Sequence, residues 1–332
     1  MPEPQLTLTI AVLSYRRPGT LRAGLPLVIA QAERLGAELA RDVTAEVLVV
    51  DNDPAASARL TVDGIRSALD RPELLRYVVE PAPGIAAARN RALDESAASE
   101  LLVFIDDDEL PRGRWLTPLV STWLDTRATA VMGRVISEFE GELDPWVAAG
   151  SFFRRRSMPT GTEITVAAAG NLLLDRQRLG ELGVRFEPAL GLGSGEDSLF
   201  SRQLVKRGGR MVWCEESEAT DRVPRERMTR GWVLRRSWSH GNAETIVALH
   251  LAERSTGRLF VRIVAVARGL ARVLAGGLRF LFGIASRSLR HQARGLRTSY
   301  RGAGILAGGL GIAYHEYSRR GLTSTSIVGS AS

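Results

Sequence analysis

The first 106 residues alternate between short apolar runs and segments with helical spacing, and this alternation constrains the fold more than any other feature. Four apolar runs have the length and composition of buried strands, at residues 6–13, 45–52, 74–80 and 100–106. Segments with helical spacing lie between them, at residues 19–39, 57–69 and 84–97. Continuous apolar strands joined through helices are typical of a parallel sheet that is covered on both faces. The sequence therefore predicts an α/β fold with a mostly parallel sheet flanked by helices.

Polar residues mark the ends of all four predicted strands. Ser14 and Tyr15 follow the first run, Asp51 and Asn52 end the second, Glu80 ends the third, and Asp106–Asp108 end the fourth. The carboxyl ends of parallel strands meet at one edge of an open sheet, and ligands bind in the crevice outside that edge. We therefore expect these residues to line a ligand site.

The acidic run Asp106–Glu109 directly follows five apolar residues, and its charge needs a partner. Adjacent carboxylates repel one another unless water or a cation stabilises them. If the strand continues through the run, side-chain alternation places Asp106 and Asp108 on the same side. Two carboxylates placed in this way can share Mg²⁺ or Mn²⁺ with a bound phosphate. The alternative is a solvated acidic turn that caps the helix around Trp115, and the run alone does not decide between the two.

A second feature of the same edge favours an anionic ligand. Gly84 lies where a loop enters the predicted helix at 84–97, so free backbone N–H groups and the positive end of the helix dipole are available there. Arg89 and Asn90, about one turn further on, add donors that can reach a phosphate or a ribose. Asp51 can accept a hydrogen bond from a base or a ribose hydroxyl, or it can be a turn or N-cap residue, and both interpretations stay open.

Charge and cysteine content exclude some classes of protein. The net charge is +7, but Lys206 is the single lysine, and the arginines concentrate in the last third among apolar residues. No helix-turn-helix, zinc-finger or RNP-like pattern accompanies them, so we expect no nucleic-acid partner. Cys214 is the only cysteine, which excludes an intramolecular disulfide and a CxxC metal site and fits a reducing compartment. The apolar N-terminal run is interpreted as a strand rather than a signal peptide.

The composition changes after His250. Residues 258–290 are strongly apolar but are interrupted by arginines, which fall within about a third of the circumference of a helix. A charge at the centre of a bilayer is costly, so the pattern favours a helix that lies in the membrane interface. Residues 304–314 are too short to span a bilayer and are interpreted as another shallow anchor. The alternative is that both segments pack as core helices.

Several sequence blocks, taken in order, carry a resemblance to a known family. They read "LSYRRP", "LVVDN", "PGIAAARNRAL", "LLVFIDDDELP", "AAGNLLLDRQRL" and "GLGSGEDSLFSRQLVKRGGRMVW". Their order and spacing over residues 6–245 resemble family 2 glycosyltransferases of the Rossmann-like GT-A fold. The later block "VPRERMTRGWVLRRSWSHGN" (223–242) resembles a branch that includes bacterial exopolysaccharide (succinoglycan-type) glycosyltransferases.

The resemblance implies roles at the donor site. Ser14, Tyr15 and Arg16 are expected at the nucleobase, and Asp51 is expected to bind the base, usually uracil. Arg89 and Asn90, with the Gly84 loop, are expected near the ribose and the diphosphate. Asp106, Asp107 and Asp108 form the DXD motif, with Asp106 near the ribose and both Asp106 and Asp108 assigned to a Mn²⁺ or Mg²⁺ ion. Where many members carry a further histidine, this chain has Asp221 and Arg222.

The resemblance also implies a catalytic group and an acceptor site. Glu196 and Asp197 correspond to the family's acidic pair, and Asp197 is assigned as the general base. A base acting opposite the leaving group implies inversion at the anomeric carbon. The expected acceptor residues are Asn171, Trp232, Arg235, Arg236 and Trp238; the last four stand where many members carry a QxxRW block, from which this sequence departs. Asn171 can instead satisfy backbone groups, and Trp146, Trp213 and Trp232 can be core residues rather than sugar-stacking ones.

These inferences combine into one prediction. Residues 1–110 are expected to bind the nucleotide sugar, residues 111–245 to bind the acceptor and carry catalysis, and residues 246–332 to form an amphipathic helical extension on the membrane surface. The chain is then an inverting, metal-dependent glycosyltransferase that transfers a sugar from a nucleoside diphosphate sugar, a UDP-sugar by the resemblance, to a glycan or lipid-linked acceptor. The expected location is the cytoplasmic, inner face of the cell membrane.

Three rival functions were weighed. A dinucleotide oxidoreductase shares the alternating pattern, but no GxGxxG follows the first strand. A nucleotidyltransferase lacks its glycine-rich activation loop here. A catalytically silent nucleotide-binding membrane scaffold is the remaining alternative, although Asp106, Asp108 and Asp197 are all present.

Overall fold

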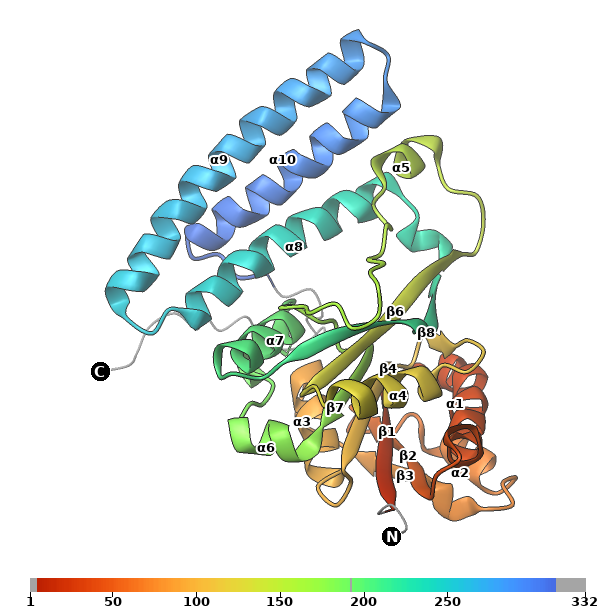
Figure 1. Cartoon of the computed structure of the whole chain (residues 1–332). Coiled ribbons are helices and arrows are strands. Elements are labelled where there is room, and N and C mark those ends of the chain that lie inside the picture. Colours follow the sequence, from red (N-terminus) through yellow and green to blue (C-terminus); the bar gives the residue numbers. More distant parts are fainter. Residues whose placement is uncertain (1–4, 192, 315–332) are drawn as a thin grey trace. The chain divides into compact units, whose positions relative to one another are not determined.

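A computed structural model describes residues 5–191 and 193–314 of the chain (Figure 1). The chain divides into two compact units. The first comprises residues 1–138, 155–188 and 200–222, and the second comprises residues 139–154, 189–199 and 223–332. The boundaries expected from the sequence lie elsewhere: the one at 110/111 falls inside strand β5 (Glu109–Pro111), and the one at 245/246 falls inside helix α8 (Arg230–Leu251).

The first unit is built on one eight-stranded sheet in the order β3-β2-β1-β4-β7-β6-β8-β5. Besides β5, its strands are β1 (Leu6–Ser14), β2 (Val43–Asp51), β3 (Leu75–Val79), β4 (Leu101–Asp106), β6 (Ala130–Phe139), β7 (Asn171–Asp175) and β8 (Met211–Val223). Strands β1 to β4 pair in parallel, as predicted from the alternating pattern. From β4 onward the pairings β4–β7, β6–β7 and β5–β8 are antiparallel.

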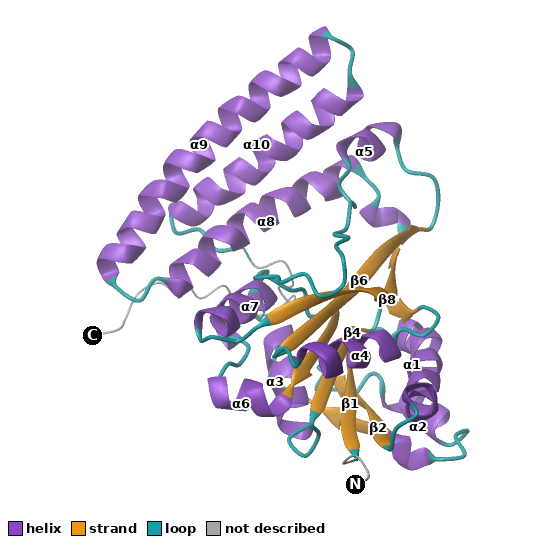
Figure 2. Ribbon diagram, viewed as in Figure 1, coloured by secondary structure: helices purple, strands orange, loops and turns teal. Residues whose placement is uncertain are grey.

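Helices cover both faces of this sheet (Figure 2). They are α1 (Pro18–Leu39), α2 (Arg59–Arg66), α3 (Ile85–Glu95), α4 (Leu116–Thr126) and α6 (Arg176–Leu182). Alternate residues of β1 explain the two cores, because Ile10 and Val12 pack with α1, α2 and α4, whereas Ala11 and Leu13 pack with α3 and α6. The expected doubly covered sheet is therefore confirmed.

The register of the parallel strands places the polar strand ends together. Ser14 at the end of β1 is the partner of Asp51 on β2, and Leu13 is the partner of Asp106 on β4. The carboxyl ends of these three central strands therefore meet at one edge of the sheet, where the sequence predicted the ligand site.

The second unit is helical. It contains α5 (Pro145–Gly150), the first turn of α7 (Glu196–Lys206), α8, α9 (Ser255–Ala285) and α10 (Leu289–Gly309). The single helical segment expected at 258–290 is thus wrong in its bounds, since α9 ends at Ala285 and α10 begins at Leu289. The segment at 304–314, expected to be a separate anchor, belongs to the end of α10 and the residues after it.

Helices α9 and α10 form a hairpin in which glycines allow close approach of the two backbones. Gly269, Gly276 and Gly283 recur every seven residues on α9, and a Cβ atom at any of them would collide with α10. Gly295, Gly302 and Gly309 repeat this spacing on α10; a Cβ atom at the first two would collide with α9, and at Gly309 it would lie 3.1 Å from the Cβ of Ala265. We call these six residues the glycine seam. In the part of the chain that the structure describes, no helix is long and apolar enough to cross a membrane.

Candidate active site

The acidic run forms a turn at the carboxyl end of β4. The strand ends at Asp106, and the chain turns at Asp107 and Asp108 before β5 begins at Glu109. The expectation that Asp106 and Asp108 share one face of a continuing strand is therefore wrong. The turn instead buries the Asp107 side chain and leaves those of Asp106 and Asp108 partly exposed.

The last residue of β1 and one residue of the loop after it contact this turn. The Ser14 hydroxyl donates to Oδ2 of Asp107 at 3.0 Å. The Arg17 guanidinium donates from Nη1 to Oδ1 of Asp107 at 3.2 Å and to Oδ2 of Asp108 at 3.0 Å. Burial nevertheless raises the pKa of Asp107 to about 7, since desolvation outweighs the attraction of Arg17. The loop after β1 thus supplies a positive charge for a site that is strongly acidic.

Glu109 adds a fourth carboxylate on the protein side of the turn. It is buried, it stands opposite Asp221 in the β5–β8 pairing, and Asp221 forms an ion pair with Arg155. Desolvation, followed by repulsion from Asp106, raises the pKa of Glu109 well above its usual range. Oε2 of Glu109 is buried and accepts no hydrogen bond from the residues that the structure describes.

Gly170 keeps space open beside these carboxylates. A Cβ atom at this position would lie 2.9 Å from Oδ2 of Asp106 and 2.8 Å from Oε1 of Glu109. Such distances are closer than real Cβ contacts, so only glycine fits here without a shift of the carboxylates.

The carboxylate oxygens of the acidic turn are ligands that a hard divalent cation prefers. In the described part of the chain, no group of three or more His, Cys, Asp or Glu side chains is placed to hold a metal ion by itself. Mg²⁺-type sites usually take only one or two carboxylates from the protein and complete their shell with substrate phosphates and water. Asp106 and Asp108, partly exposed at the turn, match that smaller requirement.

The loops after β1 and β2 are tied to each other. Arg16, at a left-handed φ of 54°, donates from Nε to Oδ2 of Asp53 at 3.0 Å and lies over the Tyr15 ring at 5.2 Å. The hydrogen bond from Arg16 is the largest cause that lowers the pKa of Asp53. Tyr15 is half-buried and Arg16 is exposed, so both are available to a ligand at this edge.

Asp51 has a structural position rather than an exposed one. It is fully buried, and its carboxylate accepts from the backbone N–H of Asp53 at 3.1 Å, the N–H of Ala58 at 2.8 Å and the Tyr77 hydroxyl at 2.9 Å. The expectation that Asp51 contacts the base is therefore wrong in this structure, and the turn interpretation holds. Asp51 shapes the loop that presents Asp53.

Asn52 connects the second strand end to the Gly84 loop. Its Nδ2 donates to the carbonyls of Glu80 at 2.9 Å and Ala82 at 2.7 Å, and its Oδ1 accepts from the N–H of Gly84 at 3.0 Å. Gly84 has a φ of 111°, which favours glycine, and it directly precedes α3. The first turn of α3 has no side-chain cap and no acidic residue, so its N–H groups remain suited to an anion.

Arg89 and Asn90 point elsewhere. Asn90 exchanges two hydrogen bonds with the backbone of Phe186, at 2.8 and 3.0 Å. Arg89 is buried, with its guanidinium 5.3 Å from the centre of the Phe186 ring. The predicted contact of these two side chains with ribose or phosphate is therefore not what the structure shows, because both hold the segment around Phe186 against α3.

Glu196 and Asp197 begin helix α7. Both lie in its first turn, where the helix dipole stabilises a carboxylate. Glu196 is buried, and Asp197 is partly exposed with Oδ1 accepting from the N–H of Ser198 at 2.6 Å. These two residues belong to the second unit, whereas the acidic run belongs to the first.

Asn171 is a buried bridge within the first unit. Its Oδ1 accepts from Nε1 of Trp115 at 2.9 Å, and its Nδ2 donates to the carbonyls of Arg134 and Ser217 at 3.1 Å each. It has no exposed surface. The expectation that Asn171 contacts an acceptor is therefore wrong, and the alternative that it satisfies backbone groups is confirmed.

The remaining expected acceptor residues lie on α8. Trp232 is half-buried and stacks on Phe153 at 6.0 Å, while Trp238 meets the Tyr314 ring edge-on at 4.9 Å. Arg235 is exposed and Arg236 is partly exposed. The four residues are close along one helix of the second unit, and only their exposed parts are available to an acceptor.

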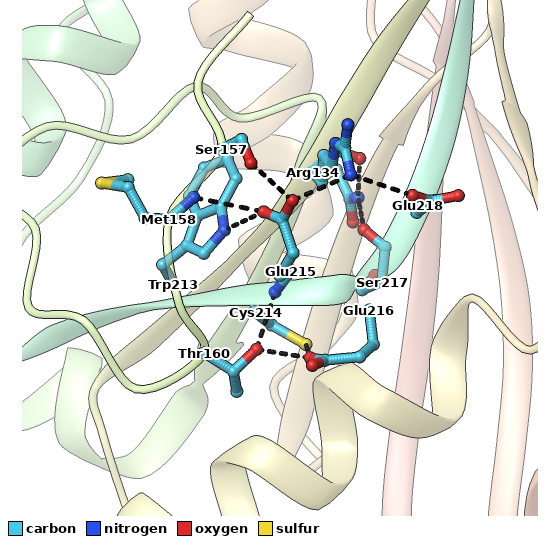
Figure 3. A network of polar contacts seen from close by, with 11 residues as sticks. Arg134, Ser157, Met158, Thr160, Trp213, Cys214, Glu215, Glu216, Ser217 and Glu218 are labelled. Carbon is cyan, nitrogen blue, oxygen red and sulfur yellow. Dashed lines mark hydrogen bonds and ion pairs between the residues drawn. The ribbon is translucent and has the colours of Figure 1, made fainter.

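A network around Glu215 holds the segment that follows residue 155 against β8 (Figure 3). Glu215 accepts from Ser157 at 2.7 Å and from Nε1 of Trp213 at 2.8 Å, and it forms an ion pair with Arg134 at 2.8 Å. Trp213 is therefore a core residue with a satisfied N–H group. Trp146 is likewise buried, so the sugar-stacking interpretation fails for both.

Sequence reasoning missed Arg17 and Asp53, and it gave no role to Asn52 or Glu109, although it placed Asn52 at the end of the second strand and Glu109 in the acidic run. Arg17, Asn52 and Glu109 each adjoin a residue that was chosen, and Asp53 lies two positions after Asp51, so their proximity to the strand ends was a usable signal. The conformation of the turn after each strand decides which of the adjacent residues at that strand end faces the site.

Comparison with known proteins agrees with this architecture. Residues 9–183 match the family described as "Glycosyl transferase family 2". Over 328 residues, which is 98% of this chain and the whole of the relative, the chain is 31% identical to the succinoglycan biosynthesis protein ExoM of Rhizobium meliloti (strain 1021).

Two solved structures show the same GT-A fold. One is TarS 1–349 of S. aureus in complex with UDP, with 17% identity, a TM-score of 0.51, and coverage of 89% of this chain and 91% of that one. The other is the mannosyltransferase PcManGT of Pyrobaculum calidifontis in complex with GDP-Man and Mn²⁺, with 19% identity, a TM-score of 0.55, and coverage of 90% and 87%. From the family match and the identity over its whole length, the chain belongs to glycosyltransferase family 2.

Proposed function

We propose that this glycosyltransferase uses a nucleoside diphosphate sugar, with UDP as the expected nucleotide, and transfers the sugar with inversion to a hydroxyl of a glycan or lipid-linked acceptor. The observation that carries the proposal is the acidic turn at the carboxyl end of β4, which Ser14 and Arg17 contact from the loop after β1. The fold relatives were crystallised with UDP or with GDP-Man and Mn²⁺, which supports such a donor.

Asp106 and Asp108 would hold a Mn²⁺ or Mg²⁺ ion together with oxygens of the donor diphosphate. The cation would neutralise part of the negative charge that the leaving diphosphate gains. Arg17 would add a second positive charge, and the free N–H groups at the start of α3 would bind phosphate oxygens. Tyr15 and the Arg16–Asp53 pair would face the nucleoside.

Asp197 is the proposed general base. It would take the proton from the acceptor hydroxyl while that oxygen forms its bond to the anomeric carbon, and the bond from that carbon to the diphosphate would break on the opposite side. This geometry inverts the anomeric configuration. Glu196, buried beside it, is a positioning residue in this proposal.

The acceptor would be bound through the second unit. Trp232, Trp238, Arg235 and Arg236 on α8 offer partly exposed rings and guanidinium groups for a glycan. The relative ExoM is described as a succinoglycan biosynthesis protein, which supports a cell-surface glycan as the product. We propose that the enzyme works at the cytoplasmic face of the cell membrane, with the α9–α10 hairpin towards the lipid.

Calorimetric titration of UDP, with and without Mn²⁺, tests the donor site. We expect binding that requires Mn²⁺ in the wild type and a loss of at least tenfold in affinity in Asp108→Asn, because one carboxylate ligand is removed. Asp94→Asn removes the same charge from an exposed ion pair on α3 and should bind like the wild type. If UDP, GDP and dTDP all bind equally well without metal, the proposed cation site is wrong.

Asp197→Asn separates binding from chemistry. The variant should retain Mn²⁺-dependent UDP binding and lose transfer by about 10²-fold or more, since the proton acceptor is missing. The readout is sugar transfer to acceptors extracted with membranes. Wild-type protein that binds UDP and Mn²⁺ but transfers none of the UDP-sugars would support the scaffold alternative.

A further inference from the structure

Helix α9 exposes a continuous apolar stripe. Leu274 and Leu278 are exposed to 67% and 69%, and Leu281 and Phe282 to 60% and 58%. The stripe continues towards the start of the helix through five further exposed residues, which fall on the same side at about 100° per residue: Leu259, Phe260, Ile263, Val264 and Leu270. Side chains at this spacing share one face of a helix. Large apolar surfaces of this kind normally mark an interaction site.

Packing within the second unit does not use this stripe. The glycine seam forms the contact of α9 with α10, and its glycines are buried while the stripe is exposed. Helix α9 therefore has one face for α10 and another face that needs a different partner. With 31 residues it is about 46 Å long at 1.5 Å per residue.

The hairpin is also exceptionally basic. Residues 254–314 contain eleven arginines and no lysine, aspartate or glutamate. Part of this charge is neutralised on α8, where Glu244 forms ion pairs with Arg268 at 2.7 Å and Arg301 at 2.9 Å.

A second group of arginines, which we call the arginine cluster, has no such partner. It consists of Arg154, Arg279, Arg290 and Arg294, and no carboxylate forms an ion pair with these residues in the described part of the chain. Arg290 and Arg294 are four residues apart on α10, which places them on the same side of that helix. Repulsion from Arg290 first, and also from Arg279 and Arg154, lowers the pKa of Arg294. Arg294 reaches Oγ of Ser151 at 3.4 Å, and the next turn of α10 is held by Arg297, which donates to the carbonyl of Ser151 at 3.1 Å.

We propose that the hairpin is a docking surface for an anionic phospholipid bilayer, with the stripe of α9 among the acyl chains and the arginine cluster on the lipid phosphates. This inference deepens the membrane location in the proposed function and rests on it, but it does not depend on the donor or the cation. Exposed leucine and phenylalanine beside unneutralised arginine match the two layers of a lipid surface, hydrocarbon and anionic headgroup.

Other occupants match the surface less well. A nucleic acid would neutralise the arginines but would leave the apolar stripe in water. A second copy of the chain would cover the stripe but would bring two arginine-rich hairpins together without counter-charges. A bilayer that contains anionic lipid satisfies both features at once.

Vesicle flotation of the full chain tests this proposal. Wild-type protein should float with vesicles of phosphatidylcholine and phosphatidylglycerol and bind pure phosphatidylcholine much more weakly. The double variant Arg279→Gln/Arg290→Gln should lose about tenfold or more of its affinity for the anionic vesicles. Leu274→Ser/Leu278→Ser should weaken binding to both kinds of vesicle.

A charge-matched control is Arg71→Gln/Arg178→Gln, which removes two exposed arginines of the first unit. It should float like the wild type, and circular dichroism should show that every variant is folded. Mn²⁺-dependent UDP binding should stay unchanged in both hairpin variants, which separates this proposal from the donor site. Equal binding to neutral and anionic vesicles, equal losses in the two arginine pairs, or a stable lipid-free dimer at low salt that the leucine variant dissociates would overturn it.

Discussion

Arg17 shows how the site balances charge at the scale of single residues. The turn after β4 brings Asp106, Asp107, Asp108 and Glu109 together, and Arg17 contacts two of them. Glu109, by contrast, is buried with an unpaired Oε2 atom and a strongly raised pKa. The compensation is therefore incomplete, and a bound cation would relieve the remaining repulsion.

The buried carboxyl of Asp107 should make stability depend on pH. Its pKa rises from 3.8 to about 7 on folding, so the folded state holds this proton more tightly than the unfolded state. This group therefore lowers the free energy of unfolding as pH rises from about 4 to about 7. In the presence of EDTA, the Tm of the wild type should fall relative to that of Asp107→Asn between pH 5 and pH 8. Thermal unfolding followed by circular dichroism measures this, and a constant difference across that range would contradict the raised pKa.

The sequence predicted which strand ends meet at the candidate site, but several residues chosen there bond within the protein instead. Asp106–Asp108 and Gly84 lie at the predicted edge because parallel strands bring their carboxyl ends together. Asp51, Asn90 and Asn171 lie beside that edge but bond to the protein itself. The backbone conformation of a single turn residue decides whether a polar side chain faces a ligand or a neighbouring loop. The pattern of residue types does not specify that conformation.

At the scale of elements, the hairpin depends on the glycine seam. The seven-residue spacing of these glycines is visible in the sequence. The apolar residues around them instead led to the prediction of one continuous helix over residues 258–290. The break at Ser286–Ser288 carries no proline and no glycine, and its local signal is Ser288, whose side chain caps the start of α10. Packing of α10 back onto α9, a long-range interaction, defines the two helices.

Two adjacent glycines give a matched test of the seam. At Gly276 a Cβ atom would lie 2.6 Å from the Gly295 carbonyl oxygen, whereas at Gly277 nothing lies within 4 Å. Gly276→Ala should therefore destabilise the hairpin by about 1–3 kcal/mol, while Gly277→Ala should stabilise it by up to about 1 kcal/mol through helix propensity. Denaturant unfolding and limited proteolysis of α9 measure both effects. Equal effects of the two substitutions would rule out close backbone packing at the seam.

At the scale of the whole molecule, charge is segregated along the chain. The eleven arginines of residues 254–314 exceed the net charge of +7, so the remaining residues are acidic overall. The basic hairpin also carries the exposed apolar stripe. Mutual repulsion of the hairpins is therefore expected to keep separate molecules apart in the absence of lipid.

High salt should weaken the repulsion between hairpins and so favour association of the lipid-free protein. The Debye length falls from about 10 Å at 0.1 M to about 3 Å at 1 M, so repulsion between arginines weakens while the attraction between apolar stripes does not. We expect the lipid-free protein to self-associate more as NaCl is raised, and Leu274→Ser/Leu278→Ser to stay monomeric. Analytical ultracentrifugation measures the change. Dissociation at high salt would instead indicate that ion pairs hold the copies together.

The division of the chain was the least predictable property of the molecule. The sequence placed boundaries at 110/111 and 245/246. The chain instead passes from one compact unit to the other near residues 139, 155, 189, 200 and 223. Helix α7, which carries Asp197, begins in one unit and ends in the other. The composition of a segment depends only on residues that are neighbours in the sequence. The boundaries of the two units depend on contacts between residues that are distant in the sequence.

Gly170 has a consequence for how much sequence change this site can tolerate. A side chain larger than the hydrogen atom of this glycine would meet the carboxylates of Asp106 and Glu109. The atoms that it would meet are the ends of two side chains, so the carboxylates would move and the backbone would stay in place. A larger residue at position 170 is therefore expected to spare the fold and to displace these two carboxylates beside the proposed cation.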